Sequence, residues 1–282
     1  PAVKESALWL KSQGFEVDIA PVDEKGFVDV KALASLIRSD TTLVSVMAVN
    51  NEIGSIQPIQ AISELLADKP TISFHVDAVQ ALAKIPTEKY LTNRVDFATF
   101  SSHKFHGVRG VGFVYIKSGK KITPLLTGGG QEGDYRSTTE NVAGIAATAK
   151  ALRLSMEKLE LFTSKTGQMK SVIRQALLNY PDIFVFSDEK GFAPHILTFG
   201  IKGVRGEVIV HAFEDYDIFI STTSACSSKA GKPAGTLIAM GVDKDKAQSA
   251  VRLSLDLEND MSQVEQFLTK LKLIYNQTRK VR

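Results

Sequence analysis

The chain contains one cysteine, no long apolar run and almost no excess of either charge. With Cys226 alone it can form neither an internal disulfide nor a site of clustered cysteines, and we expect no bound metal. No stretch approaches the roughly 20 apolar residues that span a bilayer, and the first residues do not resemble a signal peptide. A cytoplasmic protein without membrane contact is therefore expected. The 34 basic and 31 acidic side chains leave a net charge of +3, so direct nucleic-acid binding is not expected either.

The composition is that of an ordinary folded protein. Hydrophobic residues make up 44% of the 282 positions and charged residues 23%. A chain of this length buries a substantial core and forms one large domain or two unequal ones. No internal repeat or low-complexity segment interrupts it.

The first half of the chain alternates short apolar strands with helical segments. Because the strands are apolar throughout, they indicate a mostly parallel sheet that is covered on both faces. The expected strands are 15–19, 42–49, 71–76, 95–100 and 110–116, and the expected helices are 6–14, 30–38, 59–67 and 78–83.

A long connecting helix is expected over 142–161, because apolar residues recur there at helical spacing. We place a domain boundary near residue 158, between a large domain (1–158) and a smaller C-terminal α+β domain (159–282). In the smaller domain we expect helices at 169–178, 206–214 and 261–276, and strands at 183–186, 196–199 and 249–255.

Polar side chains follow three successive strands of the predicted sheet, at the edge where open parallel sheets bind ligands. They are Asn51, Asp77 with Gln80 one turn later, and the run 101–104 that ends in Lys104. Each could be a turn cap or a solvated surface residue when taken alone. Together they supply an amine for a Schiff base, a carboxylate for a pyridine nitrogen and donors for a phosphate. This combination predicts a pyridoxal 5'-phosphate site.

Cys226 lies in a run of small polar residues, 222–231, that is too poor in apolar groups to be a core strand. A lone cysteine is commonly a buried structural residue. Here the surrounding sequence favours a loop, in which the thiol is accessible and can ionise. We therefore expect Cys226 to be reactive.

Four motifs resemble those of the NifS-like cysteine desulfurases, which belong to the class-V aminotransferases. They are VNNEIG at 49–54, HVDAVQ at 75–80, SSHK at 101–104 and SAC at 224–226. The resemblance implies fold type I of the pyridoxal-phosphate enzymes, the aspartate aminotransferase-like architecture, and a homodimer. It also implies conversion of L-cysteine to L-alanine, with the sulfur passing to a persulfide on the enzyme. A protein acceptor would then receive the sulfur for iron–sulfur cluster assembly or for thiolation of tRNA or cofactors.

The resemblance also assigns cofactor contacts. Lys104 would hold the cofactor as an imine and Asp77 would pair with the ring nitrogen. Asn51 and Gln80 resemble the residues beside the ring hydroxyl. The phosphate ligands would be Ser101 and His103, with Thr139 reaching the phosphate of the partner subunit.

Arg252 resembles the residue that binds the carboxylate of the substrate, with Asn51 beside it, and Cys226 resembles the one that takes the sulfur. A bidentate guanidinium suits a carboxylate, although an arginine that ends a strand is also an ordinary surface residue.

Two other functions stay open at this point. Another class-V enzyme, such as an aminotransferase or a selenocysteine lyase, would need Lys104 and Asp77 but not Cys226. An inactive fragment would only bind a partner. The family has an earlier segment with a phosphate-binding loop and a histidine that stacks on the cofactor, and it is not found here. The resemblance therefore implies a fragment or a cleaved product that by itself binds the cofactor weakly or not at all.

Overall fold

The computed structural model describes residues 2–223 and 235–280, which form two compact units. The parallel-sheet unit comprises Asp40–Ala48 and Ile59–Leu159. The antiparallel-sheet unit comprises Pro1–Ser39, Val49–Pro58 and Glu160–Arg282. Each unit is described by itself, and the domain limits expected from the sequence stay a prediction.

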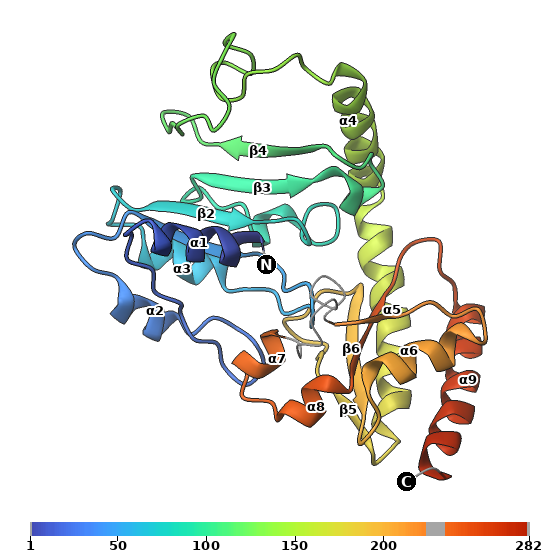
Figure 1. Ribbon diagram of the computed structural model, residues 1–282. Helices are drawn as coiled ribbons and strands as arrows, with labels where there is room; N and C mark the ends of the chain where they lie inside the picture. Colours follow the sequence, from blue (N-terminus) through green and yellow to red (C-terminus); the bar gives the residue numbers. More distant parts are fainter. Residues whose placement is uncertain (1, 224–234, 281–282) are drawn as a thin grey trace. The chain divides into compact units, whose positions relative to one another are not determined.

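Helices and strands alternate through much of the chain (Figure 1). In order they are α1 (Ala2–Ser12), α2 (Val30–Leu36), β1 (Leu43–Met47), α3 (Ile59–Leu65), β2 (Ser73–Asp77), the 3-10 helix η1 (Thr87–Lys89), β3 (Phe97–Ser101), the 3-10 helix η2 (Ser102–Phe105), β4 (Gly112–Ile116), α4 (Val142–Glu157), α5 (Leu159–Leu178), β5 (Ile183–Val185), β6 (Ile196–Ile201), α6 (Gly206–Glu214), β7 (Ser221–Thr222), α7 (Gly235–Ala239), α8 (Lys244–Gln248), β8 (Ala250–Ser254) and α9 (Met261–Lys280).

The parallel-sheet unit contains a four-stranded sheet in the order β1, β2, β3, β4. The first three strands are parallel and β4 runs antiparallel to β3 (Figure 1). Along β1, β2 and β3 buried apolar residues alternate with half-buried or exposed ones, so the buried side chains lie on one face of the sheet, and no residue of β4 is buried. Val44, Val46, Phe74, Val76 and Ala98 are among these buried side chains. The mostly parallel sheet expected from the sequence is thus confirmed.

A largely buried ion pair between Arg94 and Asp96 stabilises the interior of this unit. Arg94 Nη1 lies 2.7 Å from Asp96 Oδ2, and the Arg94 guanidinium also donates to the carbonyls of Leu66, Lys69 and Ile72. Burial opposes the charged form of Asp96. The hydrogen bond from the N–H of Phe74 and the neighbouring Arg94 nevertheless hold the pKa of Asp96 below its ordinary value. Arg94 thus ties the segment between α3 and β2 to the start of β3.

We expect Arg94→Leu to lower the free energy of unfolding by about 3 kcal/mol, because it removes the nearer of the two cations beside the buried Asp96 carboxylate and leaves only Lys120, at 3.5 Å. Urea denaturation near pH 7 measures this loss. Arg153→Leu is the matched control, because Arg153 makes an exposed helical pair with Glu157, and such pairs contribute about 0.5 kcal/mol or less. Equal losses in the two variants would contradict the bracing role of Arg94.

The antiparallel-sheet unit contains a second four-stranded sheet in the order β5, β6, β8, β7, with antiparallel neighbours throughout. All six residues of β6 are buried. The core of the unit is formed by apolar side chains of this sheet and of α5, α6 and α9. It includes Phe199, Phe213 and Phe267, the last two stacked at 4.9 Å between ring centroids.

Two segments from the first part of the chain belong to the same unit. Gln57 is buried and binds the loop before α2, donating to Gly26 O at 2.8 Å and accepting from Val28 N at 2.8 Å. Ile53 is fully buried in a cluster with Phe192 and Leu237. Segment 49–58 is therefore built into this unit by both hydrogen bonds and apolar packing.

Two expected elements are wrong. Residues 15–19 pair with no strand among the described residues, and Phe15 and Ile19 are exposed. A segment with alternating apolar and polar residues forms a strand only where a neighbouring strand completes its hydrogen bonds. Residues 78–83 form successive turns instead of a helix, because Ala83 adopts a left-handed backbone (φ 57°) and Pro86 follows closely.

Other elements differ in extent. The helix expected over 142–161 is divided at Lys158 into α4 and α5, and α5 continues without a break through Leu178. The elements β7, α7 and α8 were not predicted, because each is too short for its hydrophobic periodicity to be recognised in the sequence. The remaining expected helices and strands are present, with ends that differ by a few residues.

Lys170 of α5 is a buried cation in the antiparallel-sheet unit. Its ammonium donates to Ala193 O at 2.8 Å and lies 5.6 Å from the centroid of the Phe192 ring. Burial, with a smaller contribution from the charge of Arg174, lowers the pKa of Lys170 to about 8.

This lowered pKa makes the stability of the unit depend on pH. Between about pH 8 and pH 10.5 the folded chain binds fewer protons at Lys170 than the unfolded chain, so the stability contributed by this group rises with pH. We expect wild type to gain about 2 to 3 kcal/mol relative to Lys170→Met between pH 7 and pH 10. Urea denaturation of both proteins at the two pH values measures this difference. Lys190→Met, at an exposed position nearby, provides the control, and a pH-independent difference for Lys170→Met would refute the burial effect.

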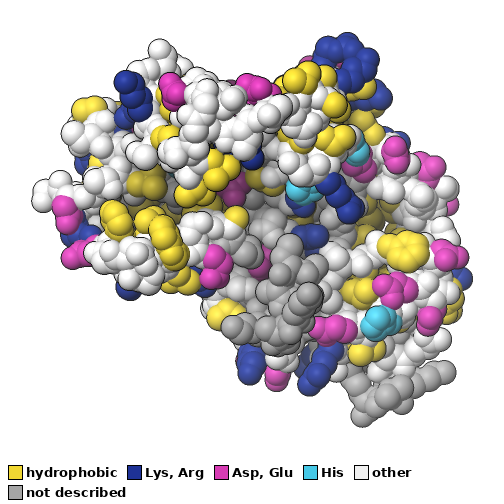
Figure 2. Space-filling view, turned by 45° about the horizontal axis from the view of Figure 1, so that its top comes forward, with side chains coloured by type: hydrophobic (Ala, Val, Ile, Leu, Met, Phe, Trp, Pro, Cys, Tyr) yellow, Lys and Arg dark blue, Asp and Glu magenta, His cyan; other side chains and the backbone are white. Residues whose placement is uncertain are grey.

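The surface carries charges of both signs. On the face drawn in Figure 2 the basic and acidic side chains of the described residues are interspersed, and no continuous basic surface is visible there. No helix in the described part of the chain is long and apolar enough to cross a membrane.

Candidate functional site

The carboxyl ends of β2 and β3 meet at one edge of the parallel sheet. Asp77 is the last residue of β2 and is paired in register with Thr99 of β3. Ser101 ends β3, and His103 and Lys104 follow in η2. Because the two strands are parallel neighbours, these predicted residues all lie at the same edge.

The turn that carries Lys104 is braced by α4. Ser102 is fully buried and its Oγ lies 2.9 Å from Thr148 Oγ1, while Ser155 Oγ donates to Phe105 O at 3.1 Å. Gly107 allows the chain to pass close to Ser102, because a Cβ at this position would lie 1.9 Å from Ser102 Oγ. These contacts fix the backbone from which the Lys104 side chain projects.

His75 lies on the same face of β2 as Asp77, two residues earlier. Its Nδ1 lies 2.7 Å from Ser45 Oγ of β1 and its Nε2 lies 3.1 Å from Thr99 Oγ1 of β3, so the imidazole links three strands. Burial lowers the pKa of His75, although the charge of Asp77 acts in the opposite direction. At neutral pH the ring is therefore uncharged.

His75 was not among the residues predicted to form the site. Its position in the HVDAVQ motif could have indicated that His75 belongs to the site. A residue two places from Asp77 in a strand lies on the same face of the sheet as Asp77. Its contacts depend on the register of β1, β2 and β3, which periodicity does not give.

The side chains at this edge fit the chemistry of pyridoxal phosphate. Lys104 makes no hydrogen bond or ion pair with another described residue, and its side chain is partly exposed. Asp77 accepts the N–H of Val79 at 3.1 Å and is also partly exposed. An amine and a carboxylate that are not consumed by structural pairs, with Ser101 and His103 beside them, suit a charged aromatic ligand.

Gln80 and Thr139 belong to the same unit. Gln80 is partly buried in the turn that follows Asp77, and Thr139 is exposed in the segment between β4 and α4. Their roles toward the ring hydroxyl and toward the phosphate of a partner subunit stay predictions.

Asn51 and Arg252 meet in the antiparallel-sheet unit. Arg252 of β8 donates from Nη1 to the carbonyl of Asn51 at 2.7 Å. The backbone contact thus joins the two residues predicted to hold the substrate. Cys226 lies outside the described residues.

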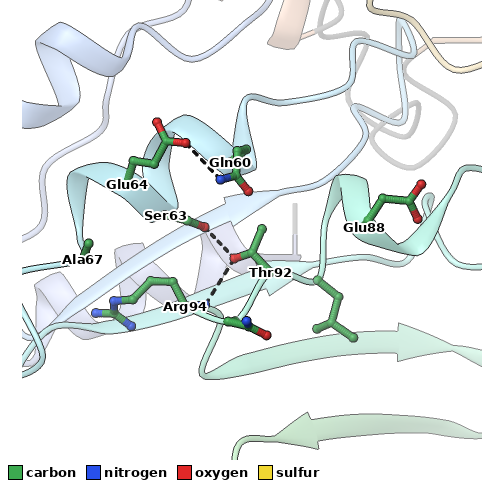
Figure 3. Close-up of a pocket in the computed structure, with 9 residues that line it drawn as sticks. Gln60, Ser63, Glu64, Ala67, Glu88, Thr92 and Arg94 are labelled. Atoms are coloured by element: carbon green, nitrogen blue, oxygen red, sulfur yellow. Dashed lines mark hydrogen bonds between the residues drawn. The ribbon is translucent and has the colours of Figure 1, made fainter.

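One groove in the parallel-sheet unit is unrelated to these residues. It has a volume of about 430 Å³ and lies between α3 and the segment that follows η1 (Figure 3). Ser63 Oγ and Thr92 Oγ1 are 2.6 Å apart on its wall, and Gln60 donates to Glu64 at 2.9 Å. None of the predicted site residues lines it.

Comparison with known proteins decides the family. Residues 3–267 match the aminotransferase class-V family. The chain belongs to this family. The resemblance and the fold class inferred from the sequence are thereby confirmed, and the enzymes of the family depend on pyridoxal phosphate.

Curated relatives match nearly the whole chain. A NifS/IcsS protein homolog of Lactobacillus delbrueckii subsp. bulgaricus is 50% identical over 273 residues, which are 96% of this chain and 71% of the relative. Cysteine desulfurase IscS of Clostridium botulinum is 38% identical over 283 residues, with 99% of this chain and 71% of the relative covered. A solved NifS-like protein with 37% identity superimposes with a TM-score of 0.89 over 98% of this chain and 72% of its own length.

Proposed function

We propose that this member of the aminotransferase class-V family is a cysteine desulfurase, which converts L-cysteine to L-alanine and transfers the sulfur to Cys226. The observation that carries the proposal is the similarity to enzymes named cysteine desulfurase along 95% or more of the chain. The edge formed by Asp77 and Lys104 supports it independently, because it supplies the groups that the reaction requires.

Pyridoxal phosphate would be held at this edge by four residues of the parallel-sheet unit. Asp77 would keep the ring nitrogen protonated, Ser101 and His103 would donate to the phosphate, and Lys104 would bind the aldehyde carbon covalently. When bound, the cofactor withdraws electrons from the α-carbon of an amino acid. Because burial lowers the pKa of His75, its neutral ring would add no positive charge beside Asp77, which would leave the carboxylate available to the ring nitrogen.

The chain's own residues would perform the proton and sulfur steps. The Lys104 amine would act as the base that takes the α-proton of the substrate. Arg252 would hold the carboxylate, which orients the α-hydrogen toward that amine. The Cys226 thiolate would form a bond to the substrate sulfur while the carbon–sulfur bond breaks, so that Cys226 carries a persulfide and the carbon skeleton leaves as alanine.

Further proposals concern the assembly. Thr139 would reach the phosphate of a partner subunit in a homodimer, and a protein acceptor would take the persulfide sulfur. The sulfur would serve iron–sulfur cluster assembly or the thiolation of tRNA or cofactors.

The test is incubation of the chain, loaded with pyridoxal phosphate, with L-cysteine. We expect alanine in the medium and one added sulfur atom on the Cys226 peptide by mass spectrometry, removable by a reducing thiol. L-serine is the matched control, because it has the same carboxylate and amine and no sulfur. A keto acid in place of alanine would identify an aminotransferase, and no product from a loaded chain would indicate a binding protein.

A further inference from the structure

The turn 50–54 carries Asn51. Three of its consecutive backbone carbonyls accept hydrogen bonds from side chains of β8, of β6 and of the segment just after β5. Arg252 donates to Asn51 O at 2.7 Å, Thr198 Oγ1 to Glu52 O at 2.5 Å and Ser187 Oγ to Ile53 O at 2.6 Å. Thr198 and Ser187 are essentially inaccessible to solvent. Three neighbouring carbonyls thus each receive one side-chain donor.

Two of these donors are neighbours across the sheet. Thr198 of β6 is the register partner of Arg252 of β8. Ser187 is joined to them, because its Oγ also accepts the N–H of Thr198 at 2.9 Å. The three donors are therefore connected to one another through β6 and β8. A shift of the turn would move the Asn51 carbonyl relative to the Arg252 guanidinium that binds it.

The other polar groups of the turn are also bound. Asn50 Oδ1 accepts the N–H groups of Glu52 and Ile53 at 2.8 and 3.0 Å, and Glu52 Oε2 accepts Thr236 N at 3.0 Å. In the described part of the chain, the side-chain amide of Asn51 makes no hydrogen bond. The arrangement presents this amide while fixing the backbone on both sides of it.

We propose that Thr198, together with Ser187, is a positioning residue that sets the placement of Arg252 and Asn51 for the carboxylate of the amino-acid substrate. The inference rests on the proposed function for the identity of that substrate. Without the Thr198 hydroxyl the half-buried Glu52 carbonyl loses its side-chain donor, and we expect the turn to move away from β6 and β8 as this carbonyl seeks another partner. The consequence is weaker substrate binding and not a slower chemical step, because Thr198 lies behind the turn and contacts no predicted reacting group.

The test compares Thr198→Val, which keeps the shape and removes the hydroxyl, with Thr198→Ser, which keeps the hydroxyl. For the loaded enzyme we expect Thr198→Val to raise KM for L-cysteine by about tenfold, the effect of one lost hydrogen bond, with kcat within about twofold of wild type. Thr198→Ser should restore KM. Thr166→Val is the matched control, because Thr166 is equally buried in the same unit and donates only within α5, to Phe162 O.

Hydrogen exchange of the cofactor-free chain gives a readout that does not depend on catalysis. Amides of residues 50–57 should exchange about tenfold faster in Thr198→Val than in wild type, Thr198→Ser or Thr166→Val. If Thr198→Val does not fold, Ser187→Ala replaces it in both measurements. An unchanged KM, or a fall in kcat alone, would overturn the inference. If wild type makes no alanine, the proposed function fails, and unchanged exchange at 50–57 would then overturn the positioning role separately.

Discussion

Replacing Lys104 by alanine is expected to abolish the visible absorbance of bound pyridoxal phosphate and to lower alanine formation from L-cysteine at least a thousandfold. Lys104 is the amine that follows β3, and no other lysine stands in the turn that α4 braces. The substitution removes both the covalent attachment of the cofactor and the base that moves the α-proton. General acid–base catalysis alone contributes about 100- to 10,000-fold, so the combined loss is large.

Lys150→Ala is the control for this experiment, because Lys150 is an exposed lysine of the same unit. It should keep the absorbance and the activity of wild type. Both variants should unfold at the same urea concentration as wild type, since the Lys104 side chain makes no structural bond with another described residue. A Lys104→Ala variant that still shows the absorbance of covalently attached cofactor would place the attachment at another lysine.

The parallel sheet could be predicted because short strands rich in apolar residues alternate with helical segments, and the same pattern located Asp77 and Lys104 at the ends of two of these strands. The error at 15–19 has a physical origin, because apolar and acidic residues alternate there as they do in a strand, and only a neighbouring strand could complete its hydrogen bonds. The error at 78–83 reflects the left-handed backbone of Ala83, which no periodicity records.

The site was predicted less completely than the sheet. His75, Thr198 and Ser187 gain their roles from strand register and from contacts between segments far apart in sequence. Thr198 and Arg252 are neighbours only because β6 and β8 pair, although the helix α6 and the segment of Cys226 separate them along the chain. In the sequence, each of these three residues resembles an ordinary residue of a protein core. The sequence alone therefore gives no reason to assign it to the site.

Replacing Cys226 by serine is expected to leave cofactor binding intact and to abolish alanine formation from L-cysteine. Serine keeps the size and polarity of the side chain, but a hydroxyl at neutral pH is a far poorer nucleophile than a thiolate. Because Cys226 is the only cysteine, no other protein thiol can replace it. The absorbance of bound pyridoxal phosphate should therefore match wild type while the loss of product exceeds a hundredfold.

Ser227→Ala is the control for the cysteine, since it changes the adjacent residue and keeps the thiol. It should retain alanine formation and the added sulfur on Cys226. The Cys226→Ser variant also separates the desulfurase from other class-V enzymes, because an aminotransferase or a selenocysteine lyase reacts through the cofactor and the lysine without an enzyme thiol. Undiminished alanine and sulfide formation by Cys226→Ser would therefore remove the nucleophile from the proposed mechanism, while leaving Asp77 and Lys104 in their roles.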